Sequence, residues 1–451
     1  MARKRTYSTQ SVEQIDGQQL ASLLTEGCIV ALDVAKEKFV AAVAMPCGSI
    51  VKLLRFEHPR QTRVFLGLVL ELREACRGAV TIAMEPTGTY GDAIRHALSE
   101  AGIPIRMVSP KKTFDSRALF DDVSSLHDPK SAVHVAKLCA MGLARPWSAP
   151  SAQSVRMRTL IELREHELEG EERCFGRLEA VLARHWPELG QRLDVRSSSS
   201  ALALLAEFPS PACVRAAPED VRTLLKRASR SQLSDEKIQG VIRDAMTSLG
   251  VPATSEEERA IRTFARQAAE MRRRAELLDI ELAKTGATDD VFVRLKQWMG
   301  TFTAAAIVTL CNPMQYDHAK QLEKACGLNL REKSSGNDDP SKVRLRITKR
   351  GPSLARKLLY LFALRMIQHS PEVRAWYMRR CRYAGGAKQA AVVAVMRKLV
   401  RALFHVARGH EFDATKLFDV RRLETPVREP QGATLRRPIK RRSATAAAVT
   451  Q

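Results

Sequence analysis

The stretch that decides the fold is residues 28–56, CIVALDVAKEKFVAAVAMPCGSIVKLLRF. It contains runs of apolar and β-branched residues at 28–34, 38–45 and 49–56, separated by the charged segment AKE and by a Pro-Cys-Gly turn. Short apolar runs bounded by turn residues predict β-strands. Strands joined by such short segments predict an antiparallel β-meander at the start of a domain.

Helical and strand patterns alternate after this meander. Apolar residues within 64–72 predict a helix, AVTIAM at 79–84 predicts a buried strand that ends at Glu85, and a helix is expected after Tyr90. A strand at IPIRMV and a helix from about Asp128 to Gly142 follow. A meander followed by alternating helices and strands is the element order of an RNase H-like fold.

The rest of the chain reads as helical, so the predicted fold class is α/β plus all-α. Pro-Trp-Ser-Ala-Pro at 146–150 predicts a linker. The predicted division is an N-terminal extension at 1–27, an RNase H-like domain at 28–148, a helical and coiled-coil section at 149–290, a helical C-terminal domain at 291–410 and a basic tail at 411–451.

A heptad pattern marks the helical section. Ser255 with Glu258 three residues later predicts a capping box at a helix start. Apolar residues then alternate in steps of three and four, at Ile261, Phe264, Ala268, Met271, Ala275, Leu278 and Leu282. This seam favours a coiled coil between chains and a helical hairpin within one chain equally, because both bury the same pattern.

Charge points to a polyanionic partner. Lys and Arg number 73 against 50 Asp and Glu, which gives a net charge of +23 over 451 residues. Such an excess favours nucleic acid, and a merely soluble basic surface is the alternative. The nine scattered cysteines form no C-x-x-C pair, which argues for a reducing compartment and against a zinc site. With no long apolar run, we expect a soluble, cytoplasmic, nucleoid-associated protein without a membrane span.

Three acids occupy places suited to metal binding. Asp33 ends the first predicted strand and Glu85 the fourth, and these strands would be neighbours in the sheet. Asp128 opens a helix that could cross the same edge. Carboxylate oxygens suit Mg²⁺ or Mn²⁺, which assist phosphodiester cleavage. Each acid alone is also explained as a turn former, a strand end or a helix cap.

The strings LDVAKEKF, MEPTGTYG and the later SSG followed by RITKRG resemble the DEDD-type insertion-sequence transposases of the one-ten family. The resemblance extends from about Cys28 to Gly409. It implies a RuvC-like N-terminal domain with four acids around metal ions, a coiled coil and a C-terminal transposase domain. It also implies DNA as substrate, Mg²⁺ or Mn²⁺ as cofactor, a bridge RNA as guide, and dimers or tetramers assembled through the coiled coil.

The resemblance assigns the acids to Asp33, Glu85 and Asp128, both as catalytic residues and as metal ligands. The fourth acid of the family pattern falls on Ser131, so a neutral hydroxyl replaces an anionic ligand. Helical spacing should still point Ser131 into the site. Asp121, Asp122 or His127 could compensate for the missing acid. We expect a weakened metal site.

The resemblance places the nucleophile of the C-terminal domain at Ser335, with Ser334 as the less favoured neighbour. A serine needs a base or a metal to take its proton. The following basic residues are expected to hold DNA phosphates, although a solvated basic strand would look the same; they are Arg344, Arg346, Lys349 and Arg350. The family's Gly-rich hairpin falls on WMGTFTAAAIVTLCNP, where only Gly300 remains.

The predicted function is therefore a DNA transposase or site-specific recombinase that cuts and rejoins DNA. One alternative is a non-catalytic nucleic-acid-binding relic, in which Ser131 has ended the chemistry. Another is a metal-dependent, structure-selective nuclease that uses the N-terminal domain alone. The transposase and the nuclease differ in whether Ser335 is needed for DNA cleavage.

Overall fold

The computed structural model describes residues 7–24, 26–86, 88–120, 122, 127–333, 344–383 and 387–419, with only the backbone described at Lys333, Arg344 and Tyr383. The chain divides into two compact units, Met1–Ser151 and Ala152–Gln451. Each unit has its own hydrophobic cores. Ser335 and the basic tail beyond residue 419 lie outside the described residues.

A seven-stranded mixed sheet forms the centre of the first unit, in the order β1-β4-β3-β2-β5-β6-β7. The strands are β1 (Gln10–Ser11), β2 (Cys28–Val34), β3 (Lys38–Ala44), β4 (Ile50–Glu57), β5 (Val80–Met84), β6 (Ile105–Met107) and β7 (Arg145–Pro146). Strands β2, β3 and β4 form the antiparallel meander, β5 pairs parallel with β2, and β6 pairs parallel with β5. This mixed α/β topology agrees with the predicted RNase H-like fold.

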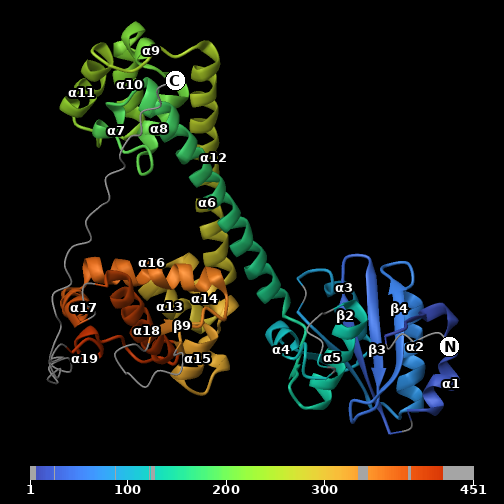
Figure 1. Ribbon diagram of the computed structural model, residues 1–451. Coiled ribbons are helices and arrows are strands. Elements are labelled where there is room, and N and C mark those ends of the chain that lie inside the picture. Colours follow the sequence, from blue (N-terminus) through green and yellow to red (C-terminus); the bar gives the residue numbers. More distant parts are fainter. Residues whose placement is uncertain are drawn as a thin grey trace, which may run out of the picture. The chain divides into compact units, whose positions relative to one another are not determined.

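Helices cover both faces of this sheet (Figure 1). They are η1 (Val12–Gln14), α1 (Gly17–Ser22), α2 (Thr62–Ala75), α3 (Asp92–Glu100), α4 (Pro110–Asp115) and α5 (Asp128–Ala140). Because side chains alternate along a strand, Val30 and Leu32 of β2 pack with α2 and α3, whereas Ile29 and Ala31 pack with α5. The stretch expected to be an N-terminal extension contributes β1 beside β4 and buries Leu20 in the core.

The second unit is mainly helical. Its helices are α6 (Ala152–His185), α7 (Leu189–Arg192), α8 (Ser199–Glu207), α9 (Pro211–Ala216), α10 (Pro218–Ala228), α11 (Asp235–Met246), α12 (Ser255–Thr285), α13 (Asp290–Met299), α14 (Thr301–Leu310), η2 (Pro313–Gln315), α15 (Ala319–Ala325), α16 (Ser353–His369), α17 (Pro371–Tyr383), α18 (Lys388–Val406) and α19 (Ala414–Leu417). A two-stranded antiparallel sheet, β8 (Leu330–Lys333) with β9 (Arg344–Ile347), completes this unit.

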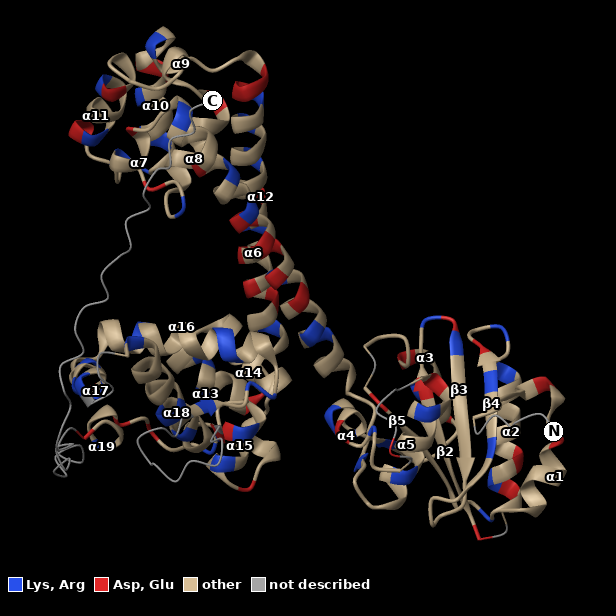
Figure 2. Cartoon of the chain, viewed as in Figure 1, with Lys and Arg blue, Asp and Glu red and all other residues tan. Residues whose placement is uncertain are grey.

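Helices α6 and α12 run antiparallel along each other (Figure 1). Contacts along their whole length fix this direction, from Gln153 with Thr285 at one end to Arg184 with Glu257 at the other. Acidic and basic residues occur along both helices (Figure 2). Several of them form ion pairs between the helices, such as Arg272 with Glu171 at 2.7 Å. Helices α7–α11 form a small lobe between the end of α6 and the start of α12.

The predicted heptad seam of α12 faces α6 of the same chain. Ile261 and Ala268 of this seam are fully buried in one core with Phe175 and Leu182 of α6. This is the intramolecular hairpin, one of the two arrangements that the pattern allows. An interface between copies of the chain would therefore have to use other surfaces.

The start of α12 corrects one local prediction. The capping box lies one residue earlier than expected: the Thr254 side chain accepts a hydrogen bond from the N–H of Glu257, and the Glu257 carboxylate accepts one from the N–H of Thr254. Ser255 is therefore the first helical residue and not the cap. Among the described residues, no helix combines the length and the apolar character needed to span a bilayer.

Candidate active site

Asp33 and Glu85 lie side by side at the carboxyl edge of the first unit's sheet. In the parallel pairing of β2 with β5, Leu32 is opposite Met84, so the next residues along the two strands are Asp33 and Glu85. Side chains two residues apart on a strand point to the same face of the sheet. Asp33 therefore points to the same face as Ala31, and Glu85 to the same face as Ala83, and both alanines pack against α5. The two carboxylates therefore lie on the sheet face that α5 covers.

Helix α5 brings a third acid and a hydroxyl to the same edge. His127 is its N-cap, with its ring nitrogen accepting a hydrogen bond from the Lys130 N–H at 3.4 Å, and Asp128 is the first helical residue. The alternative explanation of Asp128 as a helix cap is therefore wrong, because His127 is the cap. One turn later Ser131 is 7 % exposed, and its hydroxyl hydrogen-bonds to the Asp33 carboxylate.

The acids influence one another electrostatically. Burial, the negative charge of Asp128 and, to a smaller extent, that of Glu85 together raise the pKa of Asp33 to about 6. Hydrogen bonds from the Ser131 hydroxyl and from the Val34 N–H oppose this rise because they stabilise the ionised carboxylate. The structure therefore brings together Asp33, Glu85, Asp128 and Ser131.

The donor set suits a hard cation that keeps part of its water shell. Among the described residues, no three His, Cys, Asp or Glu side chains converge tightly enough to enclose a metal ion. Mg²⁺ is usually held by one or two carboxylates, and water and substrate phosphates complete its shell. Asp33 and Asp128, the more strongly coupled pair, fit that requirement, and a bound cation would relieve their mutual repulsion.

The residues considered as substitutes for the fourth acid differ in position. His127 is exposed and its ring packs edge-on against Tyr7, at 5.0 Å between ring centroids. Asp122 is exposed, with a left-handed backbone at φ 56°. Asp121 lies outside the described residues. Lys130, which sequence reasoning passed over, is 1 % exposed on the first turn of α5; a lysine between Pro129 and Ser131 gives no sequence signal of burial.

The basic residues predicted in the second unit lie on or just after β9. Arg346, Lys349 and Arg350 are exposed, and Arg344 begins the strand. Sequence reasoning missed Arg331 of β8, which is exposed and pairs directly opposite Arg346 in the ladder. The signal that could have found it is the short Leu-Arg-Glu-Lys run before SSG, which reads as the other arm of a hairpin.

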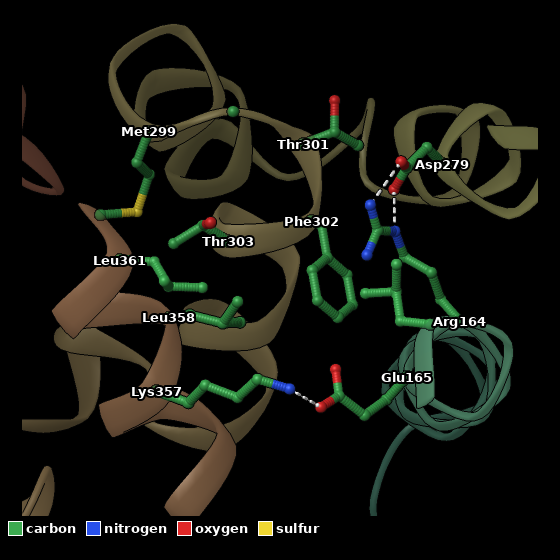
Figure 3. Close-up of a pocket in the computed structure, with 12 residues that line it drawn as sticks. Arg164, Glu165, Asp279, Met299, Thr301, Phe302, Thr303, Lys357, Leu358 and Leu361 are labelled. Carbon is green, nitrogen blue, oxygen red and sulfur yellow. Dashed lines mark hydrogen bonds and ion pairs between the residues drawn. The ribbon is translucent and has the colours of Figure 1, made fainter. Parts of the chain in front are cut away.

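Gly300 joins α13 to α14 without any intervening loop residue. Its backbone, at φ 85° and ψ 164°, is one that L side chains rarely adopt, which explains why a glycine stands here. The turn borders a pocket of about 410 Å³ between α6, α12, α14 and α16 (Figure 3).

The charged groups that line this pocket are bound to each other. Arg164 donates to both carboxylate oxygens of Asp279, at 2.6 and 2.9 Å, while its guanidinium lies 3.9 Å from the Phe302 ring centroid. Lys357 forms an ion pair with Glu165 (Figure 3). The first pair joins the two long helices α6 and α12 to each other, and the second joins α6 to α16 of the C-terminal bundle. Charged groups paired in this way favour a structural clamp over a catalytic site.

Comparisons with known families agree with this division of features. Residues 30–187 match a model described as a transposase of the DEDD type. Residues 298–378 match a model described as "Transposase IS116/IS110/IS902 family". The first match includes most of the sheet, with its acids, and the second includes β8, β9 and Ser335. The two together cover more than half of the chain. No curated protein shows a significant similarity to it.

Proposed function

Because the chain belongs to the IS110 family of DNA transposases, we propose that it cuts and rejoins DNA with two sets of residues, the acids at Asp33, Glu85 and Asp128 and a serine nucleophile at Ser335. The observation that carries the proposal is the coupling of Asp33 to Asp128 and Glu85 at one edge of an RNase H-like sheet. Three carboxylates close together on the helix-covered side of a sheet repel one another and lower the stability of the fold. Such a group is typical of a functional site, and here it could bind a metal ion.

We propose Mg²⁺ or Mn²⁺ as the cofactor. Asp33 and Asp128 would hold it, with Glu85 beside them and DNA phosphates in the remaining positions. When bound, the ion would neutralise charge on the reacting phosphate. Ser131, in place of a fourth acid, contributes only a neutral hydroxyl, so we expect the site to bind its metal more weakly than a four-acid site would.

The proposed covalent step takes place at Ser335. Its Oγ would form a bond to the phosphorus of a DNA phosphodiester while the bond from phosphorus to one deoxyribose oxygen breaks, and the serine proton is released to a base as the leaving oxygen becomes protonated. Arg344, Arg346, Lys349 and Arg350 would hold the neighbouring phosphates. The exposure of Arg346, Lys349 and Arg350 suits contacts with the DNA backbone better than base reading.

We also propose a guide RNA and self-assembly, as in the family that the sequence resembles. The net charge of +23 supports a chain that binds more than one nucleic-acid strand. Assembly into dimers or tetramers would use surfaces other than the α12 seam, which α6 occupies. RNA that copurifies with the protein and resists washing in high salt would support the guide, and its absence from an active preparation would contradict it.

Ser131 also supports a second candidate, a relic that binds DNA without cutting it. A denaturing gel that detects a covalent protein–DNA adduct separates the candidates. The transposase predicts an adduct that requires divalent metal and is lost in Ser335→Ala and in Asp33→Asn, whereas the matched control Ser334→Ala retains it. The relic predicts DNA binding with no adduct under any condition. Metal-dependent cleavage that survives Ser335→Ala would instead identify the stand-alone nuclease.

A further inference from the structure

The two strands of the second unit place arginines directly opposite each other. In the antiparallel ladder of β8 with β9, Arg331 pairs with Arg346, and Lys333 pairs with Arg344 at the next position but one. Arg331 and Arg346 are both exposed. The one acid of β8, Glu332, is opposite Leu345 and not opposite a cation.

Such an arrangement works against the hairpin that carries it. Residues directly opposite in a ladder have Cβ atoms about 5 Å apart, and like charges there are destabilising. Within the described part of the chain, neither the Arg331 nor the Arg346 guanidinium forms a hydrogen bond or an ion pair. A repulsive pair without an internal counter-ion indicates that the compensating negative charge comes from a ligand.

The base of this hairpin is fixed to the body of the unit. The Thr348 N–H donates to the Asn329 carbonyl at 2.9 Å, and the Lys349 N–H donates to the Gly327 carbonyl at 2.9 Å. Gly327 approaches the other arm so closely that a Cβ on it would lie 2.7 Å from the Arg350 nitrogen. Ile347 packs against the main core. The arginine pair is therefore held at a defined place.

We propose that Arg331 and Arg346 together bind the sugar-phosphate backbone of the DNA strand that the enzyme cuts. Guanidinium groups bind phosphate oxygens through paired N–H donors, so two opposed arginines can hold one phosphate from both sides. DNA is favoured over RNA because residues 334–343, which connect the two strands in sequence, contain Ser335. The inference rests on the proposed role of Ser335 for its choice of strand.

Charge reversal tests the pair by moving stability and binding in opposite directions. In Arg331→Glu, a cross-strand ion pair with Arg346 replaces the repulsion, so thermal unfolding of the full chain should occur at the same temperature or higher. Affinity for a fluorescein-labelled DNA duplex should fall about 10-fold or more, since a phosphate contact is lost and a negative charge gained. The slope of log K against log salt should decrease by about 0.9 for each lost contact.

The double variant Arg331→Glu/Arg346→Glu completes the cycle. It restores a like-charge pair, so its unfolding temperature should return to that of the wild type, whereas its DNA affinity should fall below that of either single variant. Arg331→Lys keeps the charge and should retain most of the binding. A hairpin with only a structural role predicts unchanged DNA affinity in all these variants, and that result would overturn the proposal.

Two controls make the outcome specific. Arg243→Glu, an exposed arginine of α11 in the α7–α11 lobe, changes the net charge by the same amount; an equal loss of affinity there would mean that only net charge matters and would overturn the proposal. A loss confined to an RNA of the same sequence would overturn the choice of DNA. Binding is measured in EDTA, without cleavage. Failure of the Ser335 chemistry would appear in the adduct assay and not in these affinities.

Discussion

Asp33 shows how one residue can be unfavourable for the fold and suitable for the chemistry. Burial and two neighbouring acids raise its pKa to about 6, so at neutral pH the folded chain holds an ionised carboxylate in a place that prefers the neutral form. The unfolded chain has the lower, ordinary pKa. Folding therefore costs more as the pH rises from about 4 to about 6, and the full cost remains above that range.

We predict that Asp33→Asn stabilises the metal-free protein at pH 7 to 8. The gain should be about 1 to 3 kcal/mol, because each unit of pKa shift corresponds to about 1.4 kcal/mol and the amide partly loses the hydrogen bonds of the carboxylate. The gain should disappear below about pH 4, where the Asp33 side chain of the wild type is protonated and therefore as neutral as the asparagine of the variant. Thermal unfolding over this pH range in EDTA measures it; a gain independent of pH would contradict the assignment.

We predict that Ser131→Asp has opposite effects with and without metal. In EDTA it should lower the unfolding temperature, because a third carboxylate approaches Asp33 and the hydroxyl donor is lost. With Mg²⁺ it should raise metal affinity about tenfold or more and speed strand cleavage. Titration calorimetry and the adduct assay measure these effects. Ser131→Ala, which removes the hydroxyl without adding charge, should show no gain, and if Ser131→Asp raises neither quantity, the missing acid is not the limiting feature.

At this scale the sequence located the acids because strand ends and helix starts are local patterns. The residues Asp33 and Glu85 become neighbours through the parallel pairing of β2 with β5, which follows from the order of predicted elements. The opposition of Arg331 and Arg346 could not be predicted, because a shift of one residue in the ladder would have changed every pairing.

The α6–α12 pair shows what an element-level pattern leaves undetermined. The heptad seam correctly identified the buried face of α12, since Ile261, Ala268 and Leu282 are fully buried. It could not identify the partner, because a helix of the same chain and a helix of another chain satisfy the same pattern. The capping residue was misplaced by one position because Thr254 and Ser255 are both good caps, and only backbone geometry separates them.

We predict that Phe175→Ala destabilises the second unit by about 3 to 5 kcal/mol, since this buried side chain fills the space between α6 and α12. The loss of stability that Phe175→Ala causes should not depend on protein concentration, because the contact lies within one chain. Leu277→Ala, on an exposed position of α12, is the matched control and should change stability by less than about 0.5 kcal/mol. A concentration-dependent effect of Phe175→Ala would indicate an interface between chains.

At the scale of the whole molecule, two units with separate cores should respond separately to a ligand. We predict that Mg²⁺ shifts the unfolding transition of the first unit only, by about 2.7 kcal/mol when the ion is at 100 times its Kd. Fluorescence distinguishes the units, because Trp147 packs in the first core whereas Trp186, Trp298 and Trp376 belong to the second unit. The shift should be absent in Asp33→Asn. An equal shift of both transitions would show that the metal binds elsewhere.

The α7–α11 lobe starts and ends at nearly the same point. The Val251 N–H donates to the Arg184 carbonyl at 2.9 Å, and the His185 ring lies 2.7 Å from the Val251 carbonyl oxygen, so the chain leaves α6 and returns to α12 through adjacent residues. Segments with joined ends can gain or lose residues in evolution without moving the helices that flank them. This makes the lobe a natural insertion site, where a reporter or an affinity tag could be placed while the acids and the basic hairpin keep their positions within their own units.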